Sequence, residues 1–216
     1  MLWTITGILF SYLVGSIPTA YIFGKALKGI DIRNLGSGNV GATNAFRVLG
    51  RGAGISVLCL DVLKGFVVAV FLSDFLISKN IGISDQMIRL LLGVSAIAGH
   101  NWTIFLNFKG GKGIATTFGV LIGLSVKIAG LSLILGLIIL TWFVVFILAR
   151  IISVASVIAG ISLPVYMFLF RGILKQPDSL LILSILLCAF VILRHKSNLK
   201  RVFQGKEPHF NFKKSV

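Results

Sequence analysis

The chain has 216 residues, of which 56% are hydrophobic and 12% are charged, and its formal net charge is +15. A soluble domain has about 25% charged residues, so this composition excludes an ordinary soluble globular protein. The basic excess favours loops that face anionic lipid over a nucleic-acid site, because no basic patch stands apart from the apolar segments. The sequence therefore predicts an all-α polytopic membrane protein, with residues 1–216 as a single domain.

Seven apolar runs follow one another along the chain, at residues 2–24, 53–77, 87–106, 114–126, 128–149, 151–170 and 179–193. A helix needs about 20 apolar residues to cross the hydrocarbon core, and most of these runs are long enough. The fourth run is short, so the count depends on a turn at Lys127, which Gly123 and Gly130 flank. With that turn, we expect seven transmembrane helices.

Basic residues divide unequally between the two sides that seven spans define. Fifteen Lys and Arg residues fall on the side of the C-terminus, and five fall on the other side: Lys79, Arg89, Lys127, Arg171 and Lys175. Cytoplasmic loops of membrane proteins carry the excess of Lys and Arg. This predicts an N-terminus outside and a C-terminus in the cytoplasm. It also places three polar segments on the cytoplasmic face: residues 25–52, residues 99–113 and the tail from residue 194.

Within the first of these segments, Asn34–Arg47 is rich in residues that suit a small anion. It holds three glycines, three asparagines, Ser37, Thr43 and Arg47, and Arg33 precedes it. Glycine lets backbone N–H groups approach a ligand, and a guanidinium can hold a phosphate through two parallel hydrogen bonds. This loop predicts an anion site at the membrane surface.

The second segment ends in the turn Gly110-Gly111-Lys112-Gly113, directly before a helix. Backbone N–H groups, the helix N-terminus and the lysine ammonium can all point at one anion in such a turn. The spacing differs from that of a Walker A loop. A basic turn that faces lipid is the alternative interpretation.

The third segment begins with Arg194-His195-Lys196-Ser197-Asn198. His195 and Asn198 are three residues apart and lie on one face if the last helix continues through them. Histidine can transfer protons near neutral pH, whereas a basic anchor at the membrane surface is the alternative role for this segment.

Asp61 and Lys64 lie inside the second apolar run, at a spacing that lets them pair on a helix. Either a functional site or a structural ion pair accounts for ionisable residues there. His100, His195 and His209 lack the spacing of metal ligands, so the sequence predicts no metal site and no cofactor.

Taken together, these motifs make the chain resemble the bacterial acyl-phosphate:glycerol-3-phosphate acyltransferases, integral membrane enzymes of phospholipid synthesis. The matching blocks follow one another along nearly the whole chain: Gly15-Ser16-Ile17-Pro18, Gly36–Asn44 with Arg47, Leu60-Asp61 with Lys64-Gly65, Gly99-His100 through Gly113, and Arg194-His195 with Asn198 and Glu207. One departure is Trp102-Thr103, where the family usually has Phe-Pro, and this difference bears on the local turn.

The resemblance implies transfer of a fatty acyl group from acyl phosphate to the 1-hydroxyl of sn-glycerol 3-phosphate. The products would be 1-acylglycerol 3-phosphate (lysophosphatidic acid) and phosphate, in the first acylation step of bacterial phospholipid synthesis. It implies a multi-pass protein of the bacterial cytoplasmic (inner) membrane, embedded in the lipid bilayer, with its active site facing the cytoplasm. It further implies no nucleic-acid partner and a transient contact with the soluble enzyme that produces acyl phosphate.

The same resemblance suggests which residues act. The catalytic candidates are Ser37, Arg47, Lys112, His195 and Asn198. The substrate-binding candidates are Gly36, Gly38, Asn39, Gly41, Thr43, Asn44, His100, Lys109, Gly110, Gly111, Gly113 and Glu207. The loop with Arg47 would bind one phosphate and Lys112 another, while the general base would be either a substrate phosphate or His195.

A transporter of anions or phospho-metabolites is the alternative class of protein. Seven spans and basic loops suit a transporter, but transporters place their polar residues near the bilayer midplane. Here the polar motifs gather at one predicted face of the membrane. The sequence therefore favours an enzyme.

Overall fold

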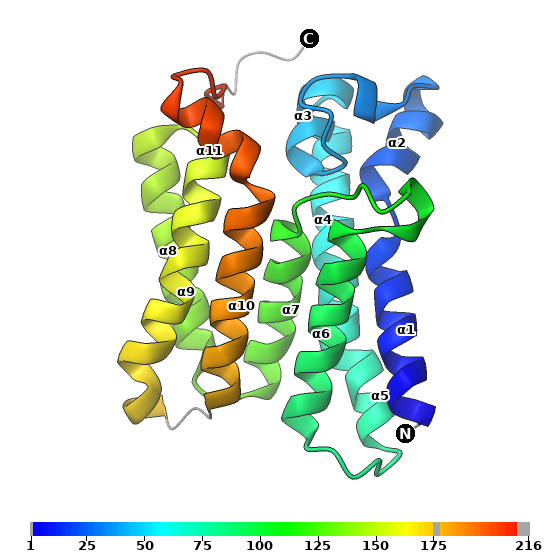
Figure 1. The fold of residues 1–216 in the computed structure, drawn as a ribbon, viewed down its shortest axis with the longest axis vertical. Helices are drawn as coiled ribbons and strands as arrows, with labels where there is room; N and C mark the ends of the chain where they lie inside the picture. Colours follow the sequence, from blue (N-terminus) through cyan, green and yellow to red (C-terminus); the bar gives the residue numbers. More distant parts are fainter. Residues whose placement is uncertain (1, 175–177, 211–216) are drawn as a thin grey trace. The chain divides into compact units, whose positions relative to one another are not determined.

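The computed structural model describes residues 2–174 and 178–210, and every regular element within them is a helix (Figure 1). This confirms the all-α prediction. The described residues form two compact units, with α7 as the last helix of the first unit and α8 as the first helix of the second. Each unit is defined by its own internal contacts, and this division does not test whether the whole chain forms one domain. The single-domain assignment stays a prediction.

The first unit carries most of the predicted site residues. Its elements are α1 (Leu2–Ser16), α2 (Thr19–Lys28), the 3₁₀ turn η1 (Ile32–Asn34), α3 (Ala42–Leu49), α4 (Arg51–Val67), the π-helical turn η2 (Val68–Leu72), α5 (Ser73–Ile77), α6 (Asp85–Asn101), the 3₁₀ turn η3 (Ile104–Leu106) and α7 (Ile114–Lys127). Helix α1 packs along α6, and α4 packs against both α7 and α3. Figure 1 shows α2 and α3 at one end of this unit, with the N-terminus and α5 at the other.

Glycines let the long helices of the first unit pack at close range. A Cβ atom on Gly65 of α4 would lie 2.2 Å from the Thr116 carbonyl oxygen, and one on Gly119 of α7 would lie 1.9 Å from the Val62 carbonyl oxygen. Such distances are too short for real atoms, so only glycine allows these helices their present separation. Gly15 of α1 meets α6 in the same way.

We expect Gly65→Ala to destabilise the protein by about 1–3 kcal/mol, because α4 and α7 must move apart to accept the methyl group. Gly52→Ala is a matched control on the same helix, since nothing lies within 4 Å of its Cβ position. That control should leave the thermal unfolding temperature in detergent unchanged or slightly raised. Equal unfolding temperatures for the two variants would contradict the close packing.

Pro18 interrupts the first apolar run. It has no N–H to donate and its ring crowds a preceding helical turn, so α1 ends at Ser16 and α2 begins at Thr19. The run predicted at residues 2–24 is therefore two helices with a break at Ile17-Pro18. The break lies in the wall of the candidate site, whose lining includes Ile17 and Pro18.

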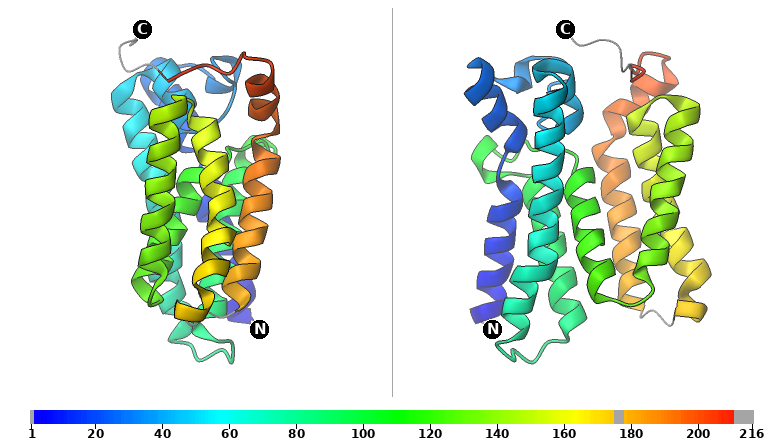
Figure 2. Two further views of the ribbon diagram at one scale, coloured as in Figure 1. Left: turned by 90° about the vertical axis from the view of Figure 1, so that its left-hand side faces the viewer. Right: turned by 180° about the vertical axis from the view of Figure 1, so that it is seen from behind.

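The second unit contains α8 (Leu131–Ala149), α9 (Ile152–Leu174), α10 (Asp178–Arg194) and α11 (Lys196–Phe203). Helix α9 packs against both α8 and α10, which Figure 2 shows from two further sides. Helices α10 and α11 meet at an angle of 58°. The interpretation of His195 and Asn198 on one face required the last helix to continue through His195. The bend shows that it does not continue straight there.

Four helical stretches among the described residues are long and apolar enough to cross a bilayer: Leu2–Lys28, Arg51–Ile77, Leu131–Ala149 and Ile152–Leu174. Helices α10 and α11 would supply a fifth if the bent pair is one span. Helix α7 has 14 residues and α6 has 17, which is short of the roughly 20 that a span needs. The seven-span count and the outside N-terminus stay predictions.

The turn expected at Lys127 is confirmed. Helix α7 ends at Lys127 and α8 begins at Leu131, after Gly130 with a left-handed φ of 80°.

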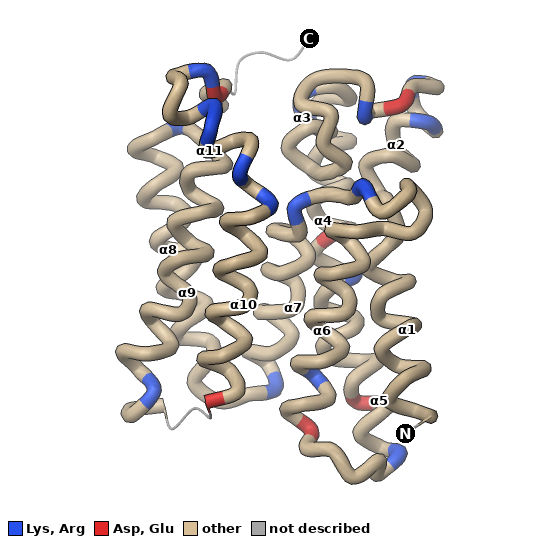
Figure 3. Tube along the Cα trace, viewed as in Figure 1, with Lys and Arg blue, Asp and Glu red and all other residues tan. Residues whose placement is uncertain are grey.

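Charges in the first unit lie mainly toward the two ends of its helices (Figure 3). The pair predicted within the second apolar run is also confirmed, since Lys64 Nζ lies 2.8 Å from Asp61 Oδ1.

Candidate functional site

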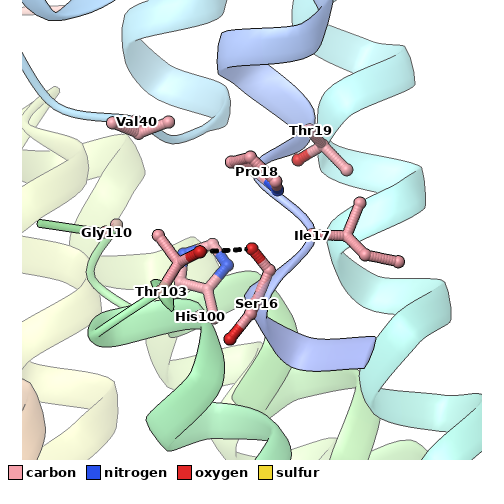
Figure 4. A pocket seen from close by; sticks show the side chains of 9 residues that line it. Ser16, Ile17, Pro18, Thr19, Val40, His100, Thr103 and Gly110 are labelled. Atoms are coloured by element: carbon pink, nitrogen blue, oxygen red, sulfur yellow. Dashed lines mark hydrogen bonds between the residues drawn. The ribbon is translucent and has the colours of Figure 1, made fainter. Parts of the chain in front are cut away.

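A small pocket opens where α1 gives way to α2, beside the C-terminal end of α6 (Figure 4). Its empty space is about 180 Å³, including the open mouth. The lining residues are Ser16, Ile17, Pro18, Thr19, Val40, His100, Thr103, Gly110 and Gly111. The fold thus brings the first two polar segments together, because Val40 belongs to the first and His100 to the second.

The departure at Trp102-Thr103 leaves a well-formed turn at the pocket wall. The Thr103 hydroxyl donates to the Ser16 carbonyl over 2.6 Å, as Figure 4 shows, and accepts the N–H of Phe105 at the start of η3. The Tyr12 hydroxyl donates to the Trp102 carbonyl over 2.5 Å. These bonds fix the turn to α1 through the Thr103 side chain and the Trp102 backbone carbonyl.

The glycine-lysine turn closes back on the end of α6. The Gly110 N–H donates to the Asn101 carbonyl over 3.2 Å, and the Gly111 N–H donates to the His100 carbonyl over 3.0 Å. The sequence suggested that these two donors point together at an anion. In the structure they instead satisfy the last carbonyls of a helix. Whether both glycines contact substrate stays a prediction.

Steric room explains why the turn needs glycine. A Cβ atom on Gly110 would lie 2.1 Å from the His100 carbonyl oxygen, and one on Gly111 would lie 2.2 Å from His100 Nε2. Gly113 has a φ of +78°, which side chains rarely adopt. The turn is thus packed directly against His100, and Lys112 is half-buried within it.

Asn44 organises the loop between η1 and α3. Its Oδ1 accepts the Ser37 N–H over 2.9 Å, and its Nδ2 donates to the carbonyls of Ile32 and Leu35 over 3.2 and 3.1 Å. The side chain is 1% exposed, so its polar groups are used within the chain. The structure therefore gives Asn44 the job of shaping the loop, while its predicted contact with substrate remains untested.

The two arginines at this loop differ in their surroundings. Arg33 pairs with Asp31 at 2.7 Å, and its guanidinium lies 5.3 Å from the Tyr21 ring centre. Hydrogen bonds from the Arg33 side chain and backbone lower the pKa of the Asp31 carboxyl to about 2. Arg47 is exposed on α3, together with the exposed Ser37 in the loop. Arg47 is thus the better placed of the two to hold an incoming phosphate.

The second unit contains a separate polar cluster at the start of α11. His195 is 3% exposed, and its Nδ1 lies 2.8 Å from the Val191 carbonyl oxygen. Because a carbonyl only accepts hydrogen bonds, this contact assigns the proton of a neutral ring to Nδ1. The other nitrogen, Nε2, is then the one that can accept a proton or a hydroxyl hydrogen bond.

Glu207 joins the tail to α9 and α11. Its Oε1 accepts hydrogen bonds from Asn198 Nδ2 and from the Ser153 hydroxyl, and its Oε2 accepts Arg201 Nε over 2.7 Å. All three donors come from the chain itself. This favours a role for Glu207 in positioning Asn198, and its predicted substrate contact stays a prediction.

Burial acts to raise the pKa of Glu207, but the hydrogen bonds from Asn198, Ser153 and Arg201 outweigh it, so the pKa lies below the ordinary 4.5. A carboxylate with a lowered folded-state pKa adds stability above its unfolded pKa and loses it as the pH falls through the folded value. We therefore expect the unfolding temperature to drop as the pH falls below 4.5.

Glu207→Gln should flatten that dependence, because no charge remains to be lost. Ser153→Ala removes one donor and should weaken the dependence without abolishing it. The check is the unfolding temperature of each variant across the acidic range. An unchanged slope in Glu207→Gln would assign the acid sensitivity to other groups.

Within residues 2–174 and 178–210, no group of three or more His, Cys, Asp or Glu residues could hold a metal ion. The absence of a metal and of a cofactor stays a prediction.

Three polar residues of the pocket were not among the candidates: Ser16, Thr19 and Thr103. A signal for the first two was present, because polar residues beside a proline inside an apolar run suggest a helix break that lines a cavity.

A family model described as glycerol-3-phosphate acyltransferase matches residues 5–205. A protein of that name from Chlorobium phaeovibrioides is 41% identical, with 94% of this chain and 95% of the relative covered. Another from Prochlorococcus marinus is 43% identical, with 93% and 95% covered.

Two crystal structures of PlsY (YgiH), an integral membrane glycerol 3-phosphate acyltransferase, have a similar fold. The glycerol 3-phosphate form matches with a TM-score of 0.81 and 36% identity, over 96% of each chain. The lysophosphatidic acid form matches with a TM-score of 0.78 and 35% identity, over 96% of this chain and 95% of that one.

Proposed function

The chain belongs to the glycerol-3-phosphate acyltransferase family, and from that premise we propose that it transfers an acyl group from acyl phosphate to glycerol 3-phosphate. In this reaction the 1-hydroxyl oxygen attacks the acyl carbonyl carbon, and the bond between that carbon and the phosphate oxygen breaks. The phosphate leaves with the bonding electron pair, and a base takes the hydroxyl proton. The products are 1-acylglycerol 3-phosphate and inorganic phosphate.

The observation that carries this proposal is the family match, which spans nearly the whole chain. Family membership makes the chain an enzyme and disfavours the anion transporter. The acyl-phosphate donor is a proposal from the sequence resemblance. Acyl phosphate is a mixed anhydride with a good leaving group, so the enzyme needs no strong nucleophile of its own. Positioning and charge stabilisation can then supply most of the rate.

Each unit offers candidates for this chemistry. In the first unit, Arg47 and Lys112 supply positive charge for the phosphates, and Ser37 supplies a hydroxyl. In the second unit, His195 presents a nitrogen that can accept a hydrogen bond from the substrate hydroxyl, and Asn198 is held by Glu207. The base is either His195 or a substrate phosphate, and the two make different predictions for the pH dependence of the rate.

Purified protein supplied with palmitoyl phosphate and glycerol 3-phosphate should release phosphate and form 1-acylglycerol 3-phosphate in equal amounts. Palmitoyl-coenzyme A and palmitoyl-acyl carrier protein should be poor donors in the same assay. Lys112→Ala serves as the control for contaminating activity. Efficient transfer from the thioesters with none from palmitoyl phosphate would refute the proposed donor while leaving the family assignment intact.

We further propose that the enzyme resides in the bacterial cytoplasmic membrane, with its active site toward the cytoplasm, where a soluble enzyme that makes acyl phosphate can reach it. A cysteine at position 196, in a background with Cys59 and Cys188 replaced by Ser, should react with a membrane-impermeant thiol reagent only in opened cells. A cysteine at position 79 should react in intact cells. Labelling of position 196 from outside would overturn the predicted orientation.

A further inference from the structure

A buried cluster of ionisable side chains lies behind the pocket of the first unit. Asp61 Oδ1 accepts the Thr19 hydroxyl over 2.7 Å and the Lys64 ammonium over 2.8 Å, and it lies 3.6 Å from His100 Nδ1. Asp61 is 1% exposed, and Lys64 and His100 are each 7% exposed. Lys64 also donates to the Ile17 carbonyl over 3.1 Å. The cluster therefore joins two walls of the pocket, the α1–α2 break and the end of α6, to helix α4.

With Asp61 and Lys64 both ionised, the net charge of this cluster depends on the protonation of His100. One carboxylate and one ammonium already cancel, so a neutral His100 leaves the buried group without net charge, whereas an imidazolium would leave an uncompensated charge. A neutral ring that faces a carboxylate with Nδ1 carries its proton on that nitrogen. The Asp61 carboxylate is the acceptor that faces it: Oδ1 lies 3.6 Å from Nδ1, and Oδ2 is buried and makes no hydrogen bond among the described residues.

His100 transmits this constraint to the glycine-lysine turn. Its ring Nε2 lies against Gly111, where a Cβ atom would be only 2.2 Å away, and its carbonyl accepts the Gly111 N–H over 3.0 Å. Lys112 is the next residue along the chain. Any rotation of the His100 ring would therefore displace Gly111 and, with it, Lys112.

We propose that Asp61 is a positioning residue that keeps a proton on Nδ1 of His100 and so orients the ring, which in turn fixes the turn carrying Lys112. This inference rests on the proposed function, because Lys112 is taken there as a phosphate-binding residue. Thr19 and Lys64 both bind Oδ1 of Asp61 and so restrict rotation of the carboxylate. Asp61 itself touches no substrate in this account.

Asp61→Asn tests the proposal but leaves the Lys64 ammonium buried without a counter-charge, which can prevent folding. The decisive variant is therefore Asp61→Asn combined with Lys64→Met, which removes both charges and keeps a similar volume. If Asp61 serves only to neutralise Lys64, the double variant should fold and work normally. If Asp61 positions His100, the double variant should fold yet lose about 100-fold in kcat/KM, the order expected from misplacing a reactive group.

The matched control is Arg171→Met combined with Asp178→Asn. It removes another ion pair, whose Nη2 and Oδ1 lie 2.9 Å apart, on helices α9 and α10. This control should keep its kcat/KM. A loss of the same size in both double variants would show a general effect of removing ion pairs and would overturn the proposal.

The second readout is independent of activity. In protein labelled with ¹⁵N-histidine, the nitrogen spectrum distinguishes a protonated from an unprotonated ring nitrogen, and loss of a signal in His100→Gln assigns the resonance. Wild type should show His100 with the proton on Nδ1, and the Asp61/Lys64 double variant should show a changed or mixed state. An unchanged His100 spectrum in that variant would overturn the proposal. Wild-type protein inactive with palmitoyl phosphate would instead refute the proposed function, and the spectrum would still report on the Asp61–His100 contact.

Discussion

Lys112→Ala should lower kcat/KM for phosphate release by two to three decades, which corresponds to about 2–4 kcal/mol of lost transition-state stabilisation. Lys112 is half-buried, in the turn that the end of α6 fixes through Gly110 and Gly111. An ammonium held in a partly dehydrated place interacts more strongly with a phosphate than one in open solvent. The measurement is steady-state kinetics with palmitoyl phosphate and glycerol 3-phosphate.

Lys109→Ala is the matched control for this prediction. Lys109 lies in the same turn but is exposed, so a charge lost there should cost little. If both lysines only anchored the turn to lipid headgroups, the two variants would show small and similar losses. A folded Lys112→Ala enzyme with a near-normal rate would remove this turn from the active site.

The positions of the helices could be predicted because apolar runs of helical length leave few alternatives. Apolar runs were expected at 128–149 and 179–193, and α8 and α10 lie within a few residues of those bounds. Local departures were missed where one residue changes the backbone. Pro18 splits the first run, and the chain bends by 58° between α10 and α11. A hydropathy pattern averages over such single positions.

The candidate site was predictable in its residue types but not in its contacts. The loop residues and the glycine-lysine turn were selected because their side chains and backbone suit an anion. The partners that these groups use come from distant parts of the chain: Thr19 bonds to Asp61 from 42 residues away, and Thr103 to Ser16 from 87. No spacing rule within one segment reveals such pairs.

The same limit applies to Glu207. The family resemblance suggested that it contacts substrate, which stays a prediction, and the fold surrounds it with Ser153, Asn198 and Arg201. A carboxylate with donors on both oxygens is well suited to hold a neighbouring side chain in place. For Asn198 this means that the amide nitrogen is committed to Glu207, which orients the amide oxygen.

His195→Ala should lower kcat by two to four decades while the protein stays folded, because the ring is the group that would accept the substrate hydroxyl proton or hydrogen bond. The Val191 carbonyl holds Nδ1, so Nε2 is the nitrogen that would act if His195 takes part. Lys196→Ala, at the neighbouring exposed position, should have a mild effect and serves as the control. A folded His195→Ala enzyme with near-normal kcat would exclude His195 from the reaction.

The pH dependence of kcat in the same variant separates the two candidate bases. If His195 is the base, the wild-type rate falls at acidic pH as Nε2 becomes protonated, and the residual rate of His195→Ala loses that limb. If a substrate phosphate is the base, the acidic limb persists in the variant, since the titrating group is still present. In that case His195 orients the hydroxyl without taking its proton, and His195→Gln, which keeps a hydrogen-bonding group, should recover part of the lost rate.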